Sequence, residues 1–266
     1  MPYKLDIETL LTKTEDAYST ALVSKDYWNF NSAFGGWSAA IAIEAVVSEP
    51  DFRGDIVHLD ATMVLPIKEG IIFIFTKKIR SGKTTDFWQV KICKANEENS
   101  ILYECRITTS LVQTSDINFQ PPFPKVVDPE GVKPQDITRG PRWMQFYDRR
   151  PVLGTAFKKN TTPYSAVWTK DKEGRPLDAK AIVSLCDTLA PRPYFMSDNM
   201  FPIATFSYSV SLFSTAKELN KKESEFVLIE GDSHCIRNGT YHQNGRVWSR
   251  LGVLLAVTNQ TAFFWE

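Results

Sequence analysis

Residues 34–47 read FGGWSAAIAIEAVV, an apolar segment that opens on two glycines. The segment is too long for a typical strand, and its alanines favour a helix. Ser38 and Glu44 are its polar side chains, so the helix is apolar on nearly every side. Because other elements must cover such a helix all round, the sequence predicts a central buried helix.

Strand-like segments follow this helix. Residues 57–65, 70–79, 86–95 and 101–112 are rich in β-branched and aromatic residues or show apolar positions at strand spacing. The last two flank the polar turn KANEENS and are typical of a long hairpin. A curved antiparallel sheet wrapped around the helix would bury both elements.

The second half of the chain repeats this order of elements. A strand over 164–168 and an apolar helical run over 177–190 precede four strand-like segments, at residues 203–213, 225–236, 239–250 and 252–264. The matching long strands begin at Val57 and Ile203, a spacing typical of a duplicated domain and not of a solenoid. We therefore predict an α+β double hot-dog fold: two tandem hot-dog domains, each a curved antiparallel sheet wrapped around a central helix.

The predicted domain boundaries follow from composition. Residues 118–141 are rich in proline and have few periodic apolar positions, which is typical of a linker. We expect an N-terminal hot-dog domain over 1–117, the linker over 118–141, and a C-terminal hot-dog domain over 142–266. The two domains can pair their sheets within the chain as a compact pseudo-dimer.

Charge and composition exclude several classes of protein. The 31 basic and 31 acidic side chains cancel, which argues against an electrostatic nucleic-acid binder. No run reaches the roughly 18 apolar residues of a membrane helix, and the opening MPYKLDIE lacks the apolar core of a secretory signal. We expect a cytoplasmic protein with no nucleic-acid or membrane partner. Because the cysteines and histidines are scattered, we also expect no metal and no cofactor.

Three polar side chains stand in otherwise apolar segments. Asp187 ends the second apolar helix, whereas Thr205 and Gln260 lie in strand-like segments. Taken singly, Asp187 could simply bond nearby backbone amides, and the other two could be ordinary solvent-facing strand residues. Taken together, a carboxylate, a hydroxyl and an amide can hold and activate one water molecule.

Other candidates carry weaker signals. His58 and His234 are possible acids or bases, although a structural histidine is the commoner case. Arg80 and Lys83 could meet a phosphate-bearing ligand, or they could form a solvated hairpin tip. A phosphate loop is excluded because Lys77 stands where its first glycine is required. The chain also lacks the Gly-x-Ser-x-Gly elbow of the α/β-hydrolases.

The order of these features across both halves resembles the type II acyl-CoA thioesterases. The resemblance spans residues 20–264 and rests on the Phe34-Gly35-Gly36 helix opening, the strand from His58 to Leu65-Pro66, the turn Arg80-Ser81-Gly82-Lys83, the lone Asp187, the strand Ile203-Ala204-Thr205 and the closing segment from Gly252 to Gln260. That family has a double hot-dog fold. Its Asp, Thr and Gln hold the water that attacks the thioester carbonyl, and by position these match Asp187, Thr205 and Gln260.

The resemblance implies an acyl-CoA substrate and direct hydrolysis, with no cofactor and no covalent intermediate. Asp187 would act as the general base, while Gln260 and Thr205 fix the water. The candidate substrate-binding residues are Gly35, Gly36, Trp37, His58, Arg80 and Lys83, with the backbone amides of the two glycines as possible oxyanion donors. We also expect a homodimer of double hot-dog units.

Two alternatives remain open at this stage. The family commonly has Gln after its two glycines, whereas this chain has Trp37, which leaves room for an acyl-CoA-binding protein without turnover. The second alternative is an acyl-thioester hydratase or dehydratase, which would need a histidine paired with the acid. The residue five positions after Asp187 is Arg192, which disfavours that alternative.

Overall fold

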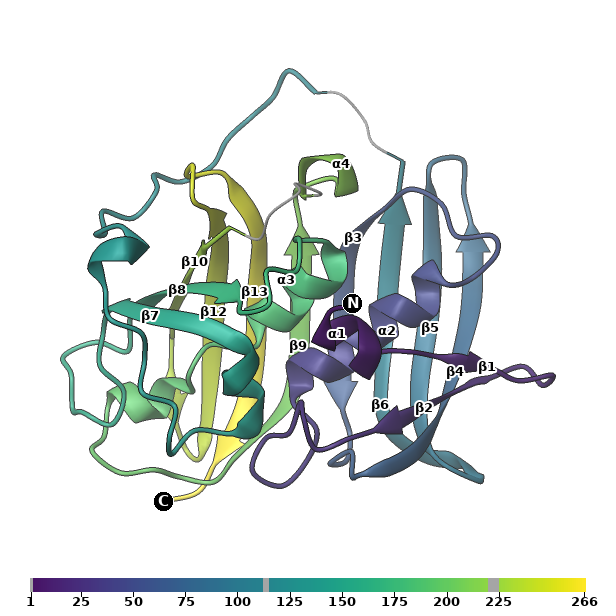
Figure 1. Cartoon of the computed structure of the whole chain (residues 1–266), viewed down its shortest axis with the longest axis horizontal. Coiled ribbons are helices and arrows are strands. Elements are labelled where there is room, and N and C mark those ends of the chain that lie inside the picture. Colours follow the sequence, from purple (N-terminus) through teal and green to yellow (C-terminus); the bar gives the residue numbers. More distant parts are fainter. Residues whose placement is uncertain (1, 112–114, 220–224) are drawn as a thin grey trace.

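A curved antiparallel sheet and two helices on one of its faces form the centre of the molecule (Figure 1). The computed structural model describes residues 2–111, 115–219 and 225–266. The two helices are α2 (Gly35–Val47) and α3 (Ala179–Cys186), and they pack against each other. Each half of the chain supplies one helix and one part of the sheet. The fold is therefore a double hot-dog, as the sequence predicts.

The two halves have the same element order. The N-terminal half contains β2 (Ser19–Val23), α2, β3 (Asp55–Met63), β4 (Gly70–Ser81), β5 (Thr85–Lys94) and β6 (Glu97–Ser110). The C-terminal half contains β8 (Ser165–Asp171), α3, β9 (Ile203–Leu212), β10 (Val227–Asp232), β12 (Thr240–Ser249) and β13 (Leu254–Phe264). The smaller elements are α1 (Lys4–Glu8), β1 (Thr12–Lys13), β7 (Tyr147–Leu153), α4 (Ala216–Leu219), β11 (Ile236–Arg237) and three 3-10 helices, η1 (Pro129–Gly131), η2 (Arg142–Phe146) and η3 (Arg192–Phe195).

The strand order is symmetric about the centre of the sheet. It runs β1-β2-β4-β5-β6-β3-β9-β13-β12-β10-β8-β7, so β3 and β9 form the junction and equivalent strands flank them on either side. At this junction His58 lies opposite Ser211, and Thr62 lies opposite Ser207. Pairing β3 with β9 covers an edge strand of each half within the chain.

The predicted central helices and long strands are confirmed, with their ends shifted by a few residues. The predicted helix over 177–190 is shorter and ends at Cys186, with Asp187 as its C-terminal cap. The predicted strand over 225–236 divides into β10 and β11. The last residue of the predicted strand over 101–112 lies outside the described residues.

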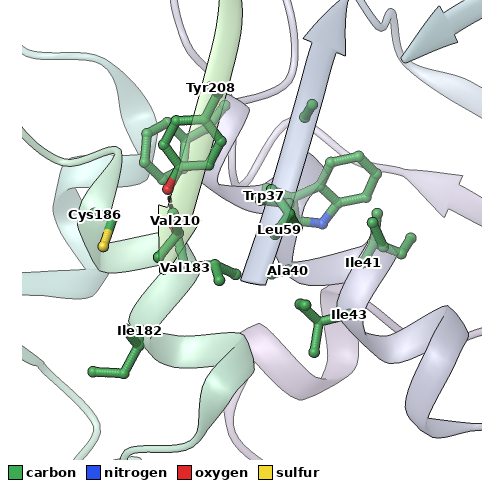
Figure 2. Close-up of a cluster of buried hydrophobic side chains, with 14 of the residues drawn as sticks. Trp37, Ala40, Ile41, Ile43, Leu59, Ile182, Val183, Cys186, Tyr208 and Val210 are labelled. Carbon is green, nitrogen blue, oxygen red and sulfur yellow. Dashed lines mark hydrogen bonds between the residues drawn. The ribbon is translucent and has the colours of Figure 1, made fainter. Parts of the chain in front are cut away.

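The core lies between the helix pair and the sheet. Ala39, Ala40 and Ala42 on α2 have no exposed surface, and these short side chains allow neighbouring elements to approach the helix closely. Figure 2 shows side chains of α2 and α3 together with residues of the central strands β3 and β9; it labels Trp37, Ala40, Ile41, Ile43, Leu59, Ile182, Val183, Cys186, Tyr208 and Val210. The Tyr208 hydroxyl donates a hydrogen bond of 2.5 Å to the carbonyl of Val183, which ties β9 to α3.

The proline-rich segment 118–141 is packed against the C-terminal half. The side chain of Gln120 donates to the carbonyl of Gly252 and accepts from the amide of Leu254. The ring of Phe123 lies 6.2 Å from that of Trp168 and 5.6 Å from that of Trp248. Among the described residues, no helix is long and apolar enough to cross a membrane.

Candidate active site

Asp187 lies where the end of α3 meets the start of α2. Its carboxylate accepts a hydrogen bond from the backbone N–H of Gly36 and another from the side-chain amide of Gln260. The distance between Gln260 Nε2 and Asp187 Oδ1 is 2.7 Å. Elements from both halves of the chain therefore meet at one carboxylate.

The two glycines that open α2 are required by this close approach. A Cβ atom on Gly35 would lie 2.7 Å from Asp187 Oδ2, and one on Gly36 would lie 2.6 Å from the carbonyl oxygen of Ser184. Both distances are shorter than real contacts of a Cβ atom. The glycines thus allow the first turn of α2 to touch the last turn of α3.

The surroundings of Asp187 make it a weak acid. Burial raises its pKa from 3.8 to about 7, against the lowering effect of the hydrogen bonds from Gln260 and Gly36. A carboxyl group with this pKa is present in both ionised and protonated forms near neutral pH. Such a group can accept a proton from water and later release it, which suits a general base.

Gln260 and Thr205 share one face of the sheet. Gln260 lies on β13 opposite Tyr208, and Thr205 lies further along β9 opposite Ala262. The register shifts between these pairs and leaves Phe206 as an extra residue on β9. Without this bulge, Thr205 would share the face of Ser207; the bulge turns it to the face of Gln260. No hydrogen bond links Thr205 to Asp187 or Gln260 within the described parts of the chain.

Trp37, the residue that follows the two glycines, points into the core. The ring is almost fully buried, and its Nε1 donates a hydrogen bond of 2.8 Å to the carbonyl of Glu8. Trp37 therefore ties α2 to α1 within the core.

His58 also lies away from Asp187. Its neighbours Leu59 and Ala61 are buried in the core with the helices, and Asp60 is exposed on the alternate face. His58 shares this second face, where its Nδ1 lies 3.0 Å from Ser211 Oγ. The sheet itself separates the imidazole from the carboxylate.

Arg80 and Lys83 are exposed at the turn between β4 and β5, as the alternative of a hairpin tip predicts. Arg53 binds Asp86 in this hairpin, and Lys78 binds Asp51. Asp51 and Arg53 follow the C-terminal end of α2, which is about 20 Å long. The turn is therefore anchored at the end of α2 opposite to Gly35, and these cations do not join Asp187.

Two residues without a predicted role lie beside the cluster. Gln243 on β12 is directly opposite Gln260, and Arg192 in η3 binds Gln243. Nothing in the sequence shows that an arginine is buried or that two glutamines are neighbours across strands. The sequence offers only the polarity of Gln243 within a strand.

Two cavities lie elsewhere. One of about 370 Å³ is lined by residues that include Leu177, Phe226 and Leu255, and one of about 50 Å³ is lined by residues that include Tyr164 and Glu230. Neither is lined by Asp187, Thr205 or Gln260, so we do not connect them with chemistry at the carboxylate.

Comparison with known proteins identifies the family. Residues 24–112 match the acyl-CoA thioesterase N-terminal domain, and residues 123–264 match the acyl-CoA thioesterase C-terminal domain. This chain belongs to the acyl-CoA thioesterase family. Its structural matches include members of the thioesterase II group, so the resemblance seen in the sequence is confirmed. No curated protein sequence matches the chain.

Solved structures share the fold of this acyl-CoA thioesterase family member over its whole length. A hot-dog protein of unknown function from Alicyclobacillus acidocaldarius has 25% identity and a TM-score of 0.95, covering 100% of this chain and 99% of its own. A protein from Thermobifida fusca, provisionally described as a thioesterase II, has 15% identity and a TM-score of 0.85, covering 100% and 99%. An acyl-CoA thioesterase II from Mycobacterium marinum has 16% identity and a TM-score of 0.77, covering 98% of each chain.

Proposed function

We propose that this family member hydrolyses acyl-CoA to a free fatty acid and CoA by means of a water molecule that Asp187 activates. The observation that carries the proposal is the state of that carboxylate. It lies between the two central helices, it is held by Gln260 and Gly36, and burial raises its pKa to about 7. This is the arrangement that a general base needs, in a chain of a thioester-hydrolysing family.

In the proposed reaction, ionised Asp187 accepts a proton from the water as the water oxygen attacks the thioester carbonyl carbon. Gln260 and Thr205 hold the water. The tetrahedral intermediate then breaks its carbon–sulfur bond, and protonated Asp187 returns its proton to the departing thiolate. One acyl-CoA and one water thus give one carboxylic acid and one CoA thiol, without an acyl-enzyme.

The developing oxyanion needs a hydrogen-bond donor. The N–H of Gly36 is already directed at Asp187, whereas the described residues contain no acceptor for the N–H of Gly35. We therefore assign the N–H of Gly35 to the oxyanion. Its place at the N-terminus of α2 adds positive potential.

The alternative functions have less support. The presence of Trp37 was the reason to consider a protein that binds acyl-CoA without turnover. Its side chain is hydrogen-bonded to α1 within the core. A hydratase or dehydratase would need a histidine near the acid, but His58 lies on the other face of the sheet. His234 and His242 stack on each other at 5.1 Å, and His242 alternates with the buried Tyr241 and Gln243 and so faces away from Asp187. Hydrolysis is the function that the site supports best.

The decisive experiment measures thiol release from a panel of acyl-CoAs, from acetyl to palmitoyl with a benzoyl and a branched member. We expect the wild type to release thiol and Asp187→Asn to lose at least about 100-fold in rate. Asp60→Asn is the matched control, because this exposed carboxylate lies on the opposite face of the sheet. A fully active Asp187→Asn enzyme, or a wild type that binds acyl-CoA but releases no thiol, would refute the proposal.

A further inference from the structure

Arg192 is a buried cation that has no ionic partner in the part of the chain that the structure describes. It has no exposed surface, and no carboxylate among the described residues forms an ion pair with it. Its hydrogen bonds go to neutral acceptors at 2.9–3.1 Å, together with one shorter contact to Ala190; the acceptors are the carbonyls of Ala190, Pro163 and Gly231, the hydroxyl of Ser165 and the side chain of Gln243. Burying a charge in this way is costly, so the fold must gain something else from it.

One of these bonds fixes the direction of an amide. Arg192 Nε donates to Gln243 Oε1 at 3.0 Å. A guanidinium can only donate, so the carbonyl of the Gln243 amide must face it. The NH2 group of Gln243 is consequently turned away from Arg192.

A second amide is fixed from the opposite side. Ionised Asp187 can only accept, so the NH2 group of Gln260 must face it, as observed. Gln243 and Gln260 lie directly opposite each other on β12 and β13, where paired Cβ atoms are about 4.5–5.5 Å apart. The NH2 group of Gln243 and the Oε1 atom of Gln260 are therefore a donor and an acceptor on adjacent side chains. Neither has a hydrogen-bond partner in the described portion of the chain.

The amide nitrogen of Gln243 and Gln260 Oε1 are not within hydrogen-bond distance of each other in this structure, although the two residues are cross-strand neighbours. We propose that a small turn of these side chains closes the bond from Gln243 to Gln260 Oε1, so that Arg192, Gln243 and Gln260 form one directed line of hydrogen bonds that ends on Asp187. The donor-only guanidinium and the acceptor-only carboxylate together set the direction of both amides. Because the two ends of an amide have nearly the same shape, an unsupported Gln260 could turn over and present its carbonyl to the carboxylate. Gln243 and Arg192 are thus positioning residues that act through Gln260. Only the kinetic consequence of this line rests on the proposed function.

The other titratable groups of this region do not compete with Asp187 in its titration range. They are the thiol of Cys186 on α3 and the phenols of Tyr103 on β6, Tyr208 on β9 and Tyr241 on β12. Burial raises the pKa of each above its ordinary value, so all four stay neutral near pH 7. Burial lowers the pKa of Arg192 to about 9, and the cation persists at neutral pH beside the more distant Asp232 and Arg149.

The line can be tested without turnover. The side-chain amide resonances of Gln260 should shift as Asp187 titrates, and the midpoint of that shift reports the pKa of Asp187. Gln243→Met fills a similar volume but removes both amide contacts, so the midpoint should rise by about half to one pH unit as the Gln260 contact weakens. Gln89→Met, a control on β5, should leave the midpoint unchanged.

A second variant guards against a failure to fold. Gln243→Asn keeps a neutral amide near Arg192 but is one methylene shorter and cannot also reach Gln260, so it should fold and still raise the midpoint without adding a charge. A midpoint that stays at its wild-type value in both variants would overturn the proposal. This outcome is independent of whether the protein hydrolyses any acyl-CoA.

The kinetic test is a double-mutant cycle. Gln243→Met should lower kcat/KM on the order of tenfold, through kcat more than KM, and move the acidic limb of the pH profile upward. In a Gln260→Met background the same change should have little further effect, because its target is gone. Additive losses, or a loss with an unmoved acidic limb, would indicate a merely structural role for Gln243. A wild type without turnover would refute the proposed function and leave the amide titration to decide the line.

Discussion

The carboxylate of Asp187 is held in surroundings that oppose its ionisation. Its pKa of about 7 lies well above the ordinary value of 3.8, because burial outweighs the hydrogen bonds from Gln260 and Gly36. The folded protein therefore binds this proton more tightly than the unfolded chain does between about pH 4 and pH 7. The contribution of Asp187 to stability is full below pH 4 and is lost as the pH rises through 7.

Replacing Asp187 by Asn should remove this pH dependence. At pH 8 we expect the free energy of unfolding of the variant to exceed that of the wild type by about 1–3 kcal/mol. This is less than the full pKa shift of Asp187 would give, because the Asp187 side chain keeps some exposed surface. At pH 4 the two should be nearly equal, since both side chains are then neutral. Urea unfolding of both proteins at the two pH values measures the effect, and a gap that is the same at both would contradict it.

The two adjacent glycines should respond differently to the same substitution. In Gly35→Ala the new methyl group meets Asp187 Oδ2 and the flexible end of Met63, so the carboxylate is displaced; we expect at least a tenfold loss of kcat/KM and little loss of stability. In Gly36→Ala it meets the backbone carbonyl of Ser184, which cannot yield, and we expect a loss of about 1–3 kcal/mol. Melting temperatures and thioesterase rates of both variants test this contrast. Equal destabilisation of the two would refute it.

Single residues also show how far the sequence predicts the site. Asp187 and Gln260 are singled out by residue type and by resemblance, and the structure brings them into contact. The face of the sheet on which His58 lies is also predictable, because Leu59 and Ala61 alternate with His58 and Asp60 in the sequence itself. The orientation of Thr205 was not predictable, since it depends on a bulge that leaves no clear signal in the sequence.

Among the elements, α2 and α3 run antiparallel, so their ends meet twice. Gly36 and Asp187 form one meeting point. At the other, Lys180 near the start of α3 lies 2.8 Å from Glu44 of α2 and 2.8 Å from Asp6 of α1. Burial raises the pKa of Asp6, but hydrogen bonds from Arg175 and Lys180 outweigh this and hold it below its ordinary value. Lys180 of α3 thus binds one carboxylate of α1 and one of α2.

Lys180→Met should test this fastening. The substitution leaves Glu44 and Asp6 without their shared cation, and we expect a loss of about 1–3 kcal/mol because both carboxylates keep some contact with water. Lys25→Met is the control: Lys25 pairs with Glu69, and both side chains are 55% exposed, so no measurable change is expected. Chemical denaturation compares the variants. Equal stability of the Lys180 variant and the wild type would show that the buried cation contributes nothing.

The elements also differ in how readily the sequence predicts them. The two central helices and the long strands are evident because burial on all sides, or on one face, imposes a strong composition. The short elements α1, β1 and β2 carry no such pattern, and β7 contains Pro151. Their positions follow from contacts with distant parts of the chain, such as the pairing of β2 with β4.

At the scale of the whole molecule, the two halves share too much to behave as separate domains. The β3–β9 pair joins their sheets, α2 packs on α3, and the candidate site takes groups from both. The duplication is readable from the sequence because element order repeats. The exact register of β3 on β9 cannot be read from the sequence, since many registers would satisfy the same composition.

This shared interface predicts cooperative unfolding. We expect a single thermal transition in which the calorimetric and van't Hoff enthalpies agree, because neither half can unfold without exposing the apolar face of the other. Scanning calorimetry, with tryptophan fluorescence as a second probe, measures this. Two resolved transitions would show that the halves are independent.

The ion pairs at the second helix meeting point have a consequence for stoichiometry. A symmetric dimer of single hot-dog chains repeats every residue at both meeting points, and so carries two equal catalytic centres. In this chain the two meeting points of α2 and α3 have different residues. Asp187 and the two glycines lie at one, and Lys180 with its acidic partners lies at the other. Each 30.2 kDa chain should therefore turn over substrate at one centre, and titration with a tight-binding substrate analogue should end at one equivalent per chain.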